Sequence, residues 1–170
     1  MICQVDSPDD IVAAAILHSE YRQIRFIVEP VDPNLVVDAD PLLLASAVMN
    51  LLLNAFKYTP PNGVVTLRAR AEEQRLVIDV EDQCGGIPDT KGELFQPFGD
   101  RRGADRSGLG LGLSIARDAV RAHQGDIHVR NMPGTGCVFS IDVPLVHDPE
   151  SFSGLSGNPA VPQATAARTP

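Results

Sequence analysis

Two asparagines and a lysine share one face of a predicted helix. Helical residues advance about 100° each, so Asn50, Asn54 and Lys57 fall within an arc of about 60°. A carboxamide oxygen is a suitable hard ligand for Mg²⁺, and a lysine ammonium one turn onward can meet a phosphate oxygen. This pattern favours the chemistry of a magnesium-bound phosphate group. An exposed polar stripe that ends in a solvated lysine is the purely structural alternative.

A glycine run further along the chain predicts a second contact with phosphate. Gly108, Gly110 and Gly112 introduce a stretch with helical spacing, and glycines at a helix start let backbone N–H groups approach an anion. The preceding residues 99–108 mix glycines with arginines, which can also reach phosphate. A lone glycine run is weak evidence, because loops and helix ends often contain one. Its meaning depends on the motifs that accompany it.

Four motifs follow one another at residues 50–59, 82–88, 95–98 and 108–114. This series resembles the N, G1, F and G2 boxes of the catalytic ATP-binding domain of sensor histidine kinases. The wider group includes DNA gyrase, mismatch-repair ATPases and a large heat-shock chaperone. The resemblance covers residues 7–145. It implies ATP and Mg²⁺ as cofactors, with a flexible lid over the nucleotide.

The resemblance also implies a role for each motif. It makes Asn54 the Mg²⁺ ligand and includes Asn50 and Lys57 with Asn54 among the catalytic residues. Asp82 becomes the base selector, because a carboxylate can accept a hydrogen bond from the exocyclic amine of adenine, where guanine presents a carbonyl. A turn-forming surface aspartate is the alternative. The implied nucleotide-binding residues are Asn54, Lys57, Tyr58, Asp82, Gly86, Ile87, Phe98, Arg101, Arg106, Gly108, Leu109, Gly110, Leu111, Gly112, Leu113 and Cys137.

Asn50 indicates which reaction to expect. It occupies the place where water-splitting relatives carry glutamate, and a neutral amide cannot act as the general base that activates water. We therefore expect little hydrolysis, and transfer of the γ-phosphoryl group to a nucleophile from elsewhere, aligned and charge-stabilised with Mg²⁺. In the family, that nucleophile is a histidine on a separate dimerisation domain.

Two other functions share the same boxes. A degenerate module would hold nucleotide, or none, and regulate partners without catalysis. A stand-alone serine kinase would act on an anti-sigma partner. The ending of the first motif, Lys57-Tyr58-Thr59-Pro60, looks more like sensor kinases.

Two cysteines depart from the family pattern. The usual first glycine of the second motif is Cys84, and Cys137 stands where the family commonly has a hydroxyl residue. If the backbone needs a positive φ at Cys84, strain follows, unless Gly85 takes that angle and leaves Gly86 for close approach to adenine. One hypothesis is that both thiols border the adenine end, where oxidation would weaken nucleotide binding. Two inert buried thiols are the favoured interpretation.

The third motif precedes the predicted lid. Phe95 and Phe98 flank Gln96 and Pro97, and the cation-bearing residues 99–108 follow. Phenylalanines can hinge a lid to the core, and a plain core role for both rings is nearly as well supported. Residues 85–108 show little periodicity, and a long loop of this kind inside a compact domain is usually functional or disordered.

Composition excludes several classes of protein. The chain has 170 residues, a formal net charge of −8 and a pI near 4.8, which disfavours nucleic acid as a partner. The start has no basic region followed by an apolar core, so we expect a cytoplasmic domain without direct membrane contact, either free or part of a membrane-bound kinase. Three cysteines show neither an even count nor metal-ligand spacing, so reduced thiols are expected.

Strands and helices are grouped as in an α/β (α+β) two-layer sandwich, with a mixed, mostly antiparallel sheet of about five strands on about three helices. Caps and prolines predict two helix starts, at Ser7-Pro8 and Asp40-Pro41. The predicted helices span residues 7–21, 41–59 and 109–122, and the predicted strands span 24–29, 35–38, 64–71, 75–81, 127–130 and 137–143.

The phosphoacceptor is expected outside this chain. His18 is the one histidine on an early helix, but no second helix of a dimerisation pair accompanies it, so a structural surface role is favoured. His123 resembles a packing or capping residue near a helix end. Partners are then a phosphoacceptor and dimerisation domain and a downstream response regulator. We expect residues 1–148 to form the catalytic domain and residues 149–170, which have few large apolar groups, to form a flexible tail.

Overall fold

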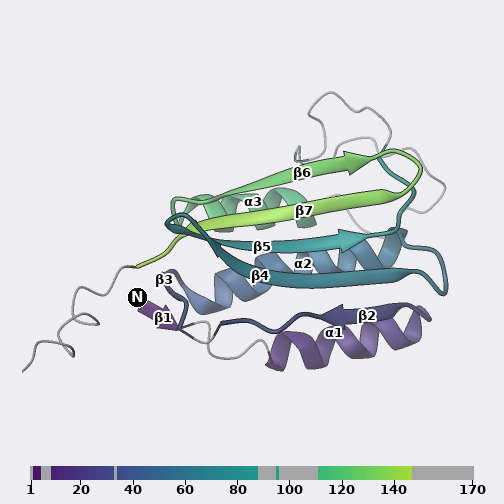
Figure 1. Ribbon diagram of the computed structural model, residues 1–170, viewed down its shortest axis with the longest axis horizontal. Coiled ribbons are helices and arrows are strands. Elements are labelled where there is room, and N and C mark those ends of the chain that lie inside the picture. The colour runs from purple at the N-terminus through teal and green to yellow at the C-terminus, as the bar shows by residue number, and fades with distance from the viewer. Residues whose placement is uncertain (1, 5–8, 33, 88–94, 96–110, 147–170) are drawn as a thin grey trace, which may run out of the picture.

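The computed structural model describes residues 2–4, 9–32, 34–87, 95 and 111–146. A five-stranded sheet forms one layer, and helices pack behind it and beside its lower edge (Figure 1). The elements are β1 (Ile2–Gln4), α1 (Asp9–Tyr21), β2 (Arg25–Val28), β3 (Val36–Asp38), α2 (Pro41–Tyr58), β4 (Val64–Glu72), β5 (Arg75–Asp82), α3 (Gly112–Arg121), β6 (Asp126–Met132) and β7 (Gly136–Pro144).

The main sheet has the strand order β2-β4-β5-β7-β6. β2 runs parallel to β4, and the other neighbouring pairs are antiparallel. The predicted fold class, a mostly antiparallel mixed sheet with three helices, is therefore confirmed. The short strand β3 pairs instead with β1, which the sequence did not predict, in a separate two-stranded sheet.

Helix α2 carries the first motif and is well defined at both ends. The Asp40 carboxylate accepts hydrogen bonds from the backbone N–H groups of Leu42 at 2.9 Å and Leu43 at 3.2 Å, with proline at the first helical position. His123, which follows the end of α3, accepts the Asp40 N–H through Nε2 at 3.4 Å and so contacts the N-cap residue of α2. The helix ends before Pro60, as predicted.

One stripe of α2 is buried in the core. Phe56 meets the ring of Phe26 edge to face, with centroids 5.4 Å apart. By length and composition alone α2 would suffice to cross a membrane, and a third of that window is buried within the fold. The stripe consists of Ala47, Val48, Leu51, Leu52, Ala55 and Phe56.

Strand β5 directs alternate side chains into the core. Leu76, Ile78 and Val80 are buried on the side that faces the helices, and successive side chains of a strand point to opposite faces. Asp82 continues this row by two residues and is also buried, with 3% exposure. The carboxylate at the end of β5 therefore points toward the helical layer.

Charged pairs hold the open face and the edge of the sheet. Arg68 contacts Glu29 and Glu81, each at 2.7 Å, on partly exposed surface. At the β6 edge, the Arg117 guanidinium hydrogen-bonds both carboxylate oxygens of Asp126, at 2.7 and 3.1 Å. This contact holds the pKa of Asp126 well below its usual range. Helix α3 is thereby tied to β6.

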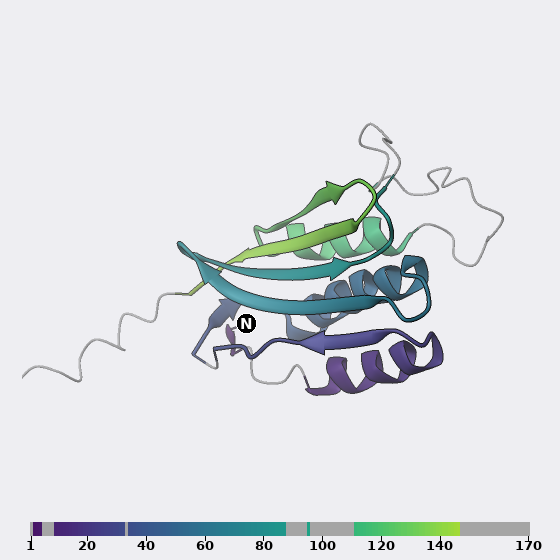
Figure 2. The same cartoon turned by 45° about the vertical axis from the view of Figure 1, so that its right-hand side comes forward.

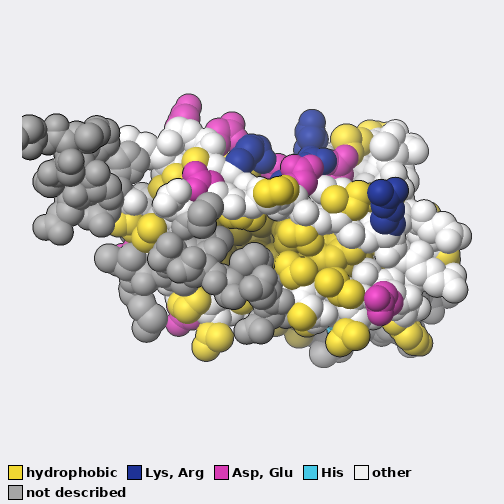
Figure 3. Space-filling model, turned by 60° about the horizontal axis from the view of Figure 1, so that its bottom comes forward, with side chains coloured by type: hydrophobic (Ala, Val, Ile, Leu, Met, Phe, Trp, Pro, Cys, Tyr) yellow, Lys and Arg dark blue, Asp and Glu magenta, His cyan; other side chains and the backbone are white. Residues whose placement is uncertain are grey.

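The surface also has an apolar side. Figure 3, which brings the lower side of Figure 1 forward, shows hydrophobic side chains gathered in a hollow, with charged side chains along its upper border. In α1, Ile16, Leu17 and Tyr21 are large apolar residues with substantial exposure. The described part of the chain therefore leaves α1 incompletely covered.

Candidate functional site

The described parts of three predicted motifs lie at one end of the molecule. The second half of α2, the end of β5 and the first turn of α3 meet at the right-hand end of Figures 1 and 2. A Cβ added at Gly112 would lie 3.2 Å from Oδ1 of Asn50, so α2 and α3 approach closely here. Motifs that are far apart in sequence are therefore neighbours in the fold.

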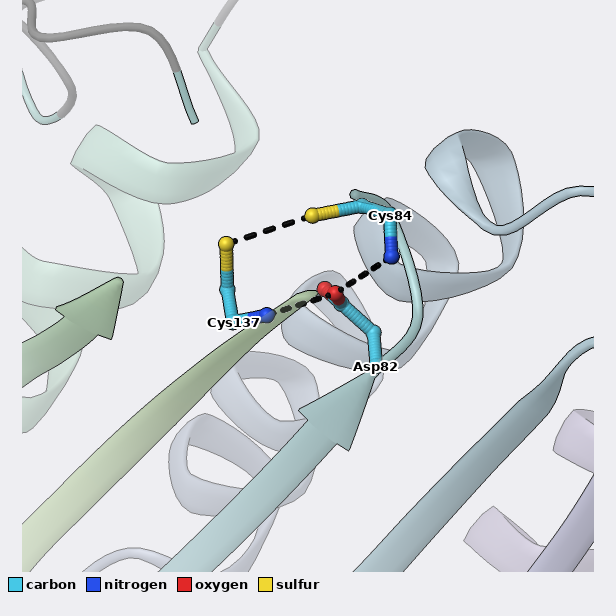
Figure 4. Close-up of side chains that lie close together, drawn as sticks. All are labelled: Asp82, Cys84 and Cys137. Carbon is cyan, nitrogen blue, oxygen red and sulfur yellow. Dashed lines mark hydrogen bonds between the residues drawn. The ribbon is translucent and has the colours of Figure 1, made fainter. Parts of the chain in front are cut away.

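Asp82 is held in one orientation by two backbone donors. Its Oδ1 accepts hydrogen bonds from the N–H groups of Cys84 and Cys137, each at 3.0 Å (Figure 4). The second contact crosses from β5 to β7, where Asp82 and Cys137 are register partners. Both backbone bonds go to Oδ1, and Oδ2 accepts neither of them.

In the turn after Asp82, Gly85 takes the unusual backbone angle, as one of the two alternatives predicted. Gly85 has φ +82° and Gly86 has φ +97°, while Cys84 is not among the described residues with positive φ. No positive φ is therefore forced on Cys84. Gly85 also accepts a hydrogen bond from the N–H of Gly134 at 2.8 Å, which joins this turn to the turn between β6 and β7.

Asn131 is a positioning residue that the sequence reasoning missed. Its Oδ1 accepts the Ile87 N–H at 2.8 Å, and its Nδ2 donates to the Ile87 carbonyl oxygen at 2.7 Å. A Cβ on Gly86 would lie 2.9 Å from Cα of Pro133, so the loop packs closely against the β6–β7 turn. The available indication was the polar residue directly after the predicted strand 127–130, which continues to Met132 in the structure.

Gly136 is required by the close approach of β7 to the backbone of Asp82. A Cβ there would overlap the Asp82 carbonyl oxygen. We expect Gly136→Ala to lower the free energy of unfolding by about 2 kcal/mol, because the backbones must separate. Urea unfolding measures the effect. Gly134→Ala is the control: its Cβ would have open space, and its φ of +80° should cost only about 1 kcal/mol. Equal losses would contradict the steric argument.

The two cysteines lie beside Asp82, as expected. Their sulfur atoms are 3.2 Å apart, and the structure assigns both as free thiols. Cys137 is fully buried and Cys84 half-buried. Burial raises the pKa of both thiols, so both are protonated at neutral pH. The pair is thus close together and unreactive by itself.

The amide face of α2 lies partly open. Asn50 donates through Nδ2 to the carbonyl oxygen of Ser46 at 3.0 Å, while the half-buried Asn54 carboxamide has no hydrogen-bond partner within the described ranges. Lys57 places its ammonium 5.4 Å from the ring centroid of Tyr58. Within the described ranges both polar atoms of the Asn54 carboxamide are therefore available to a ligand, whereas Nδ2 of Asn50 is engaged.

The third and fourth motifs are described only in part. Phe95 packs against the core, and its ring centroid lies 4.6 Å from Cζ of the Arg117 guanidinium. These contacts support the core role for the Phe95 ring. α3 begins at Gly112 rather than at residue 109; Leu111 is its N-cap residue, and Leu113 is buried in the core. The predicted site residues outside the described part are Phe98, Arg101, Arg106, Gly108, Leu109 and Gly110.

Residues 39–147 match the family described as histidine kinase-, DNA gyrase B-, and HSP90-like ATPase. The chain belongs to this family. Its curated relatives include the alginate biosynthesis sensor protein KinB of Pseudomonas aeruginosa, 34% identical over 127 residues. They also include the circadian input-output histidine kinase CikA of Synechococcus elongatus, 37% identical over 132 residues. Each match covers 74% of this chain, and this ATPase domain spans 21% and 18% of those proteins.

Solved histidine kinase structures share the fold of this ATPase domain. A mycobacterial sensor histidine kinase, MprB, superposes with a TM-score of 0.68 and 30% identity, covering 80% of this chain and 94% of that one. The catalytic domain of histidine kinase ThkA, in a nucleotide-free form, has a TM-score of 0.68 and 25% identity, with 85% and 96% covered. The chain is therefore a histidine kinase-type ATPase domain.

Proposed function

We propose that this domain binds ATP with Mg²⁺ and transfers the γ-phosphoryl group to a histidine on a separate dimerisation domain. The observation that carries the proposal is the meeting of the Asn50–Gly112 contact and the buried Asp82 carboxylate at one end of the sheet. A site for ATP needs a residue that recognises adenine at one end of the nucleotide and a phosphate-binding site at the other end. The fold supplies candidates for both at that end.

In this proposal Asp82 reads the base. Oδ1 is occupied by two backbone donors, so Oδ2 is the oxygen that accepts the exocyclic amine of adenine. Gly86 and Ile87 line the same turn, where Asn131 fixes the Ile87 backbone. A preset acceptor of this kind favours a base that presents a donor there and disfavours guanine.

The residues present fit a magnesium ion. The Asn54 carboxamide offers a hard oxygen without an internal hydrogen-bond partner among the described residues, and Lys57 and Tyr58 lie one turn beyond it. When bound, Mg²⁺ neutralises charge on the phosphate oxygens. Asn54 would hold the ion, Lys57 would neutralise phosphate charge, and Asn50 would line the contact with α3 without activating water.

The acceptor histidine is expected on another domain. His18 is exposed on α1, His123 contacts the N-cap residue of α2 through Nε2, and His128 lies 3.2 Å from Asp142. The last two are engaged in structural contacts. The partner is then a dimerisation domain bearing the acceptor, followed by a response regulator, in the compartment that supplies ATP. Residues 149–170, the proposed tail, lie outside the described part.

Phosphotransfer to that domain is the direct test. The chain is incubated with γ-labelled ATP and Mg²⁺, with and without the dimerisation domain of its parent kinase. We expect acid-labile label on the dimerisation domain only, as for phosphohistidine. Label on this chain alone would overturn the proposal. Acid-stable label on a partner would support the serine kinase, and nucleotide binding without any transfer would support the degenerate module.

A further inference from the structure

Three side chains, two from the end of β5 and the turn after it and one from β7, converge beside the proposed base site. The Cys84 and Cys137 sulfurs and a carboxylate oxygen of Asp82 all lie within 4.8 Å of one another. Asp82 and Cys137 are buried and Cys84 is half-buried (Figure 4). Cys84 and Cys137 are 53 residues apart, and pairing of β5 with β7 brings them together. Chain spacing alone therefore conceals the cluster.

We propose that Cys84, Cys137 and Asp82 form a binding site for a thiophilic divalent cation such as Zn²⁺. Two sulfurs and one carboxylate oxygen are a donor set that suits Zn²⁺ and Cd²⁺ and excludes Mg²⁺, which takes oxygen ligands. Each sulfur exchanges its proton for the metal, so two protons leave to solvent for each cation bound. Three protein ligands leave a fourth position for water.

The geometry needs only small adjustments. Sulfurs on a tetrahedral zinc, with Zn–S bonds of about 2.3 Å, lie roughly 3.8 Å apart, and here they are 3.2 Å apart. The two sulfurs must therefore move apart by about half an ångström, which rotation of the cysteine side chains can supply. Asp82 already points its carboxylate into the cluster, because the N–H groups of Cys84 and Cys137 bind its Oδ1. Oδ2 then serves as the metal ligand.

The nearest further oxygen does not complete the site. Oδ1 of Asn131 lies 3.7 Å from Sγ of Cys137, but it accepts the Ile87 N–H at 2.8 Å. A cation held by three protein ligands is bound less tightly than one in a closed four-ligand structural site, and it can leave when its supply falls. Reversible binding suits an inhibitory site better than a structural one.

Cation and adenine should exclude each other, a consequence that rests on the proposed function. The Asp82 oxygen that would accept the adenine amine is the one that would bind the metal, and one oxygen cannot serve both in this crowded turn. A cell with excess thiophilic cation would then hold the domain free of nucleotide. The cation site itself does not depend on the proposed function.

Cadmium titration of the reduced, oxygen-free domain tests the site, because cadmium–thiolate bonds have an ultraviolet charge-transfer band. We expect one Cd²⁺ per chain, with affinity at least about tenfold weaker in Cys84→Ser and in Cys137→Ser. Cys3→Ser, which changes the third cysteine, in β1, is the matched control and should bind as the native chain does. Thermal unfolding checks that each variant is folded. Equal cadmium binding in all four proteins would overturn the site, as would formation of a disulfide in place of the metal band.

Nucleotide binding in the same samples tests the exclusion. A fluorescent ATP analogue is titrated in excess Mg²⁺, without Cd²⁺ and at a Cd²⁺ concentration that fills most of the native site but leaves the weaker sites of Cys84→Ser and Cys137→Ser mostly empty. We expect cadmium to weaken its binding at least tenfold in the native chain and in Cys3→Ser, and to have little effect in the other two variants. Cadmium inhibition that persists in those two would overturn the exclusion. Absence of nucleotide binding without cadmium would instead refute the proposed function, while the metal band still reports on the site.

Discussion

Asp82→Asn should lower ATP affinity at least about 100-fold while leaving the domain folded. The variant amide keeps an oxygen for the N–H groups of Cys84 and Cys137, which bind Oδ1 in the native chain. The nitrogen of the new amide then takes the place of Oδ2, so that its N–H groups face the exocyclic amine of adenine, which is also a hydrogen-bond donor. Losing a hydrogen bond to a charged acceptor costs about 1.5–3 kcal/mol, and the opposed donors add to that loss.

The same substitution should change which base is preferred. Guanine presents a carbonyl oxygen where adenine presents its amine, so the new amide can donate to guanine. We expect the ratio of ATP affinity to GTP affinity to fall in Asp82→Asn. This fall should exceed any change in ATP affinity that a surface substitution causes. Calorimetric titration with both nucleotides measures this ratio. A parallel loss for ATP and GTP would indicate that Asp82 only supports the turn.

Glu81→Gln is the matched control for charge. Glu81 is the neighbouring residue on the opposite face of β5, where it contacts Arg68 at 2.7 Å. The change removes the same unit of charge one residue from the proposed base site, and surface ion pairs contribute little to stability. ATP affinity should therefore change less than about twofold. If Glu81→Gln lost as much ATP affinity as Asp82→Asn, the effect would come from the net charge of the domain and not from a contact with adenine.

Local patterns were sufficient to predict most of the fold. The boundaries of α2 follow from Asp40, Pro41 and Pro60, since each acts on the backbone within a few residues of itself. Alternation predicted β4 and β5 almost to the residue. β1 was missed because three residues are too few to show a period, and its partner β3 lies more than thirty residues away along the chain.

Those parts of the candidate site that lie within a sequence motif could be predicted. Contacts that depend on the register of strand pairing could not. Asp82 and Gly85 could be assigned from the motif, and the backbone angle of Gly85 confirmed the alternative that relieves Cys84. Asn131 acts on Ile87 across 44 residues, and the two sulfurs meet only because Asp82 is paired with Cys137. Such contacts depend on strand pairing, which no single stretch of sequence specifies. The cysteine count therefore argued against a metal site that the fold makes feasible.

Asn54→Ala should lower the rate of phosphotransfer at least about 100-fold, and part of the loss should be recovered by more Mg²⁺. The Asn54 amide has no hydrogen-bond partner in the described ranges, so truncation leaves no buried group unpaired and should cost little stability. Removing one ligand weakens the hold on the metal that neutralises charge in transfer, and several kcal/mol of stabilisation depend on that metal. ATP affinity, carried mainly by Asp82 and the adenine, should fall less than the rate.

The dependence on Mg²⁺ separates a ligand from a structural residue. In Asn54→Ala the Mg²⁺ concentration for half-maximal transfer should rise at least about tenfold, because the ion is bound through one ligand fewer. Asn54→Asp keeps an oxygen at that place and should fall between the native chain and the alanine variant. Leu53→Ala, on the adjacent and partly exposed position of α2, should leave the Mg²⁺ dependence unchanged. If Asn54→Ala lost activity with an unaltered Mg²⁺ requirement, the amide would act through packing against the nucleotide, and the metal would have to be held by another residue.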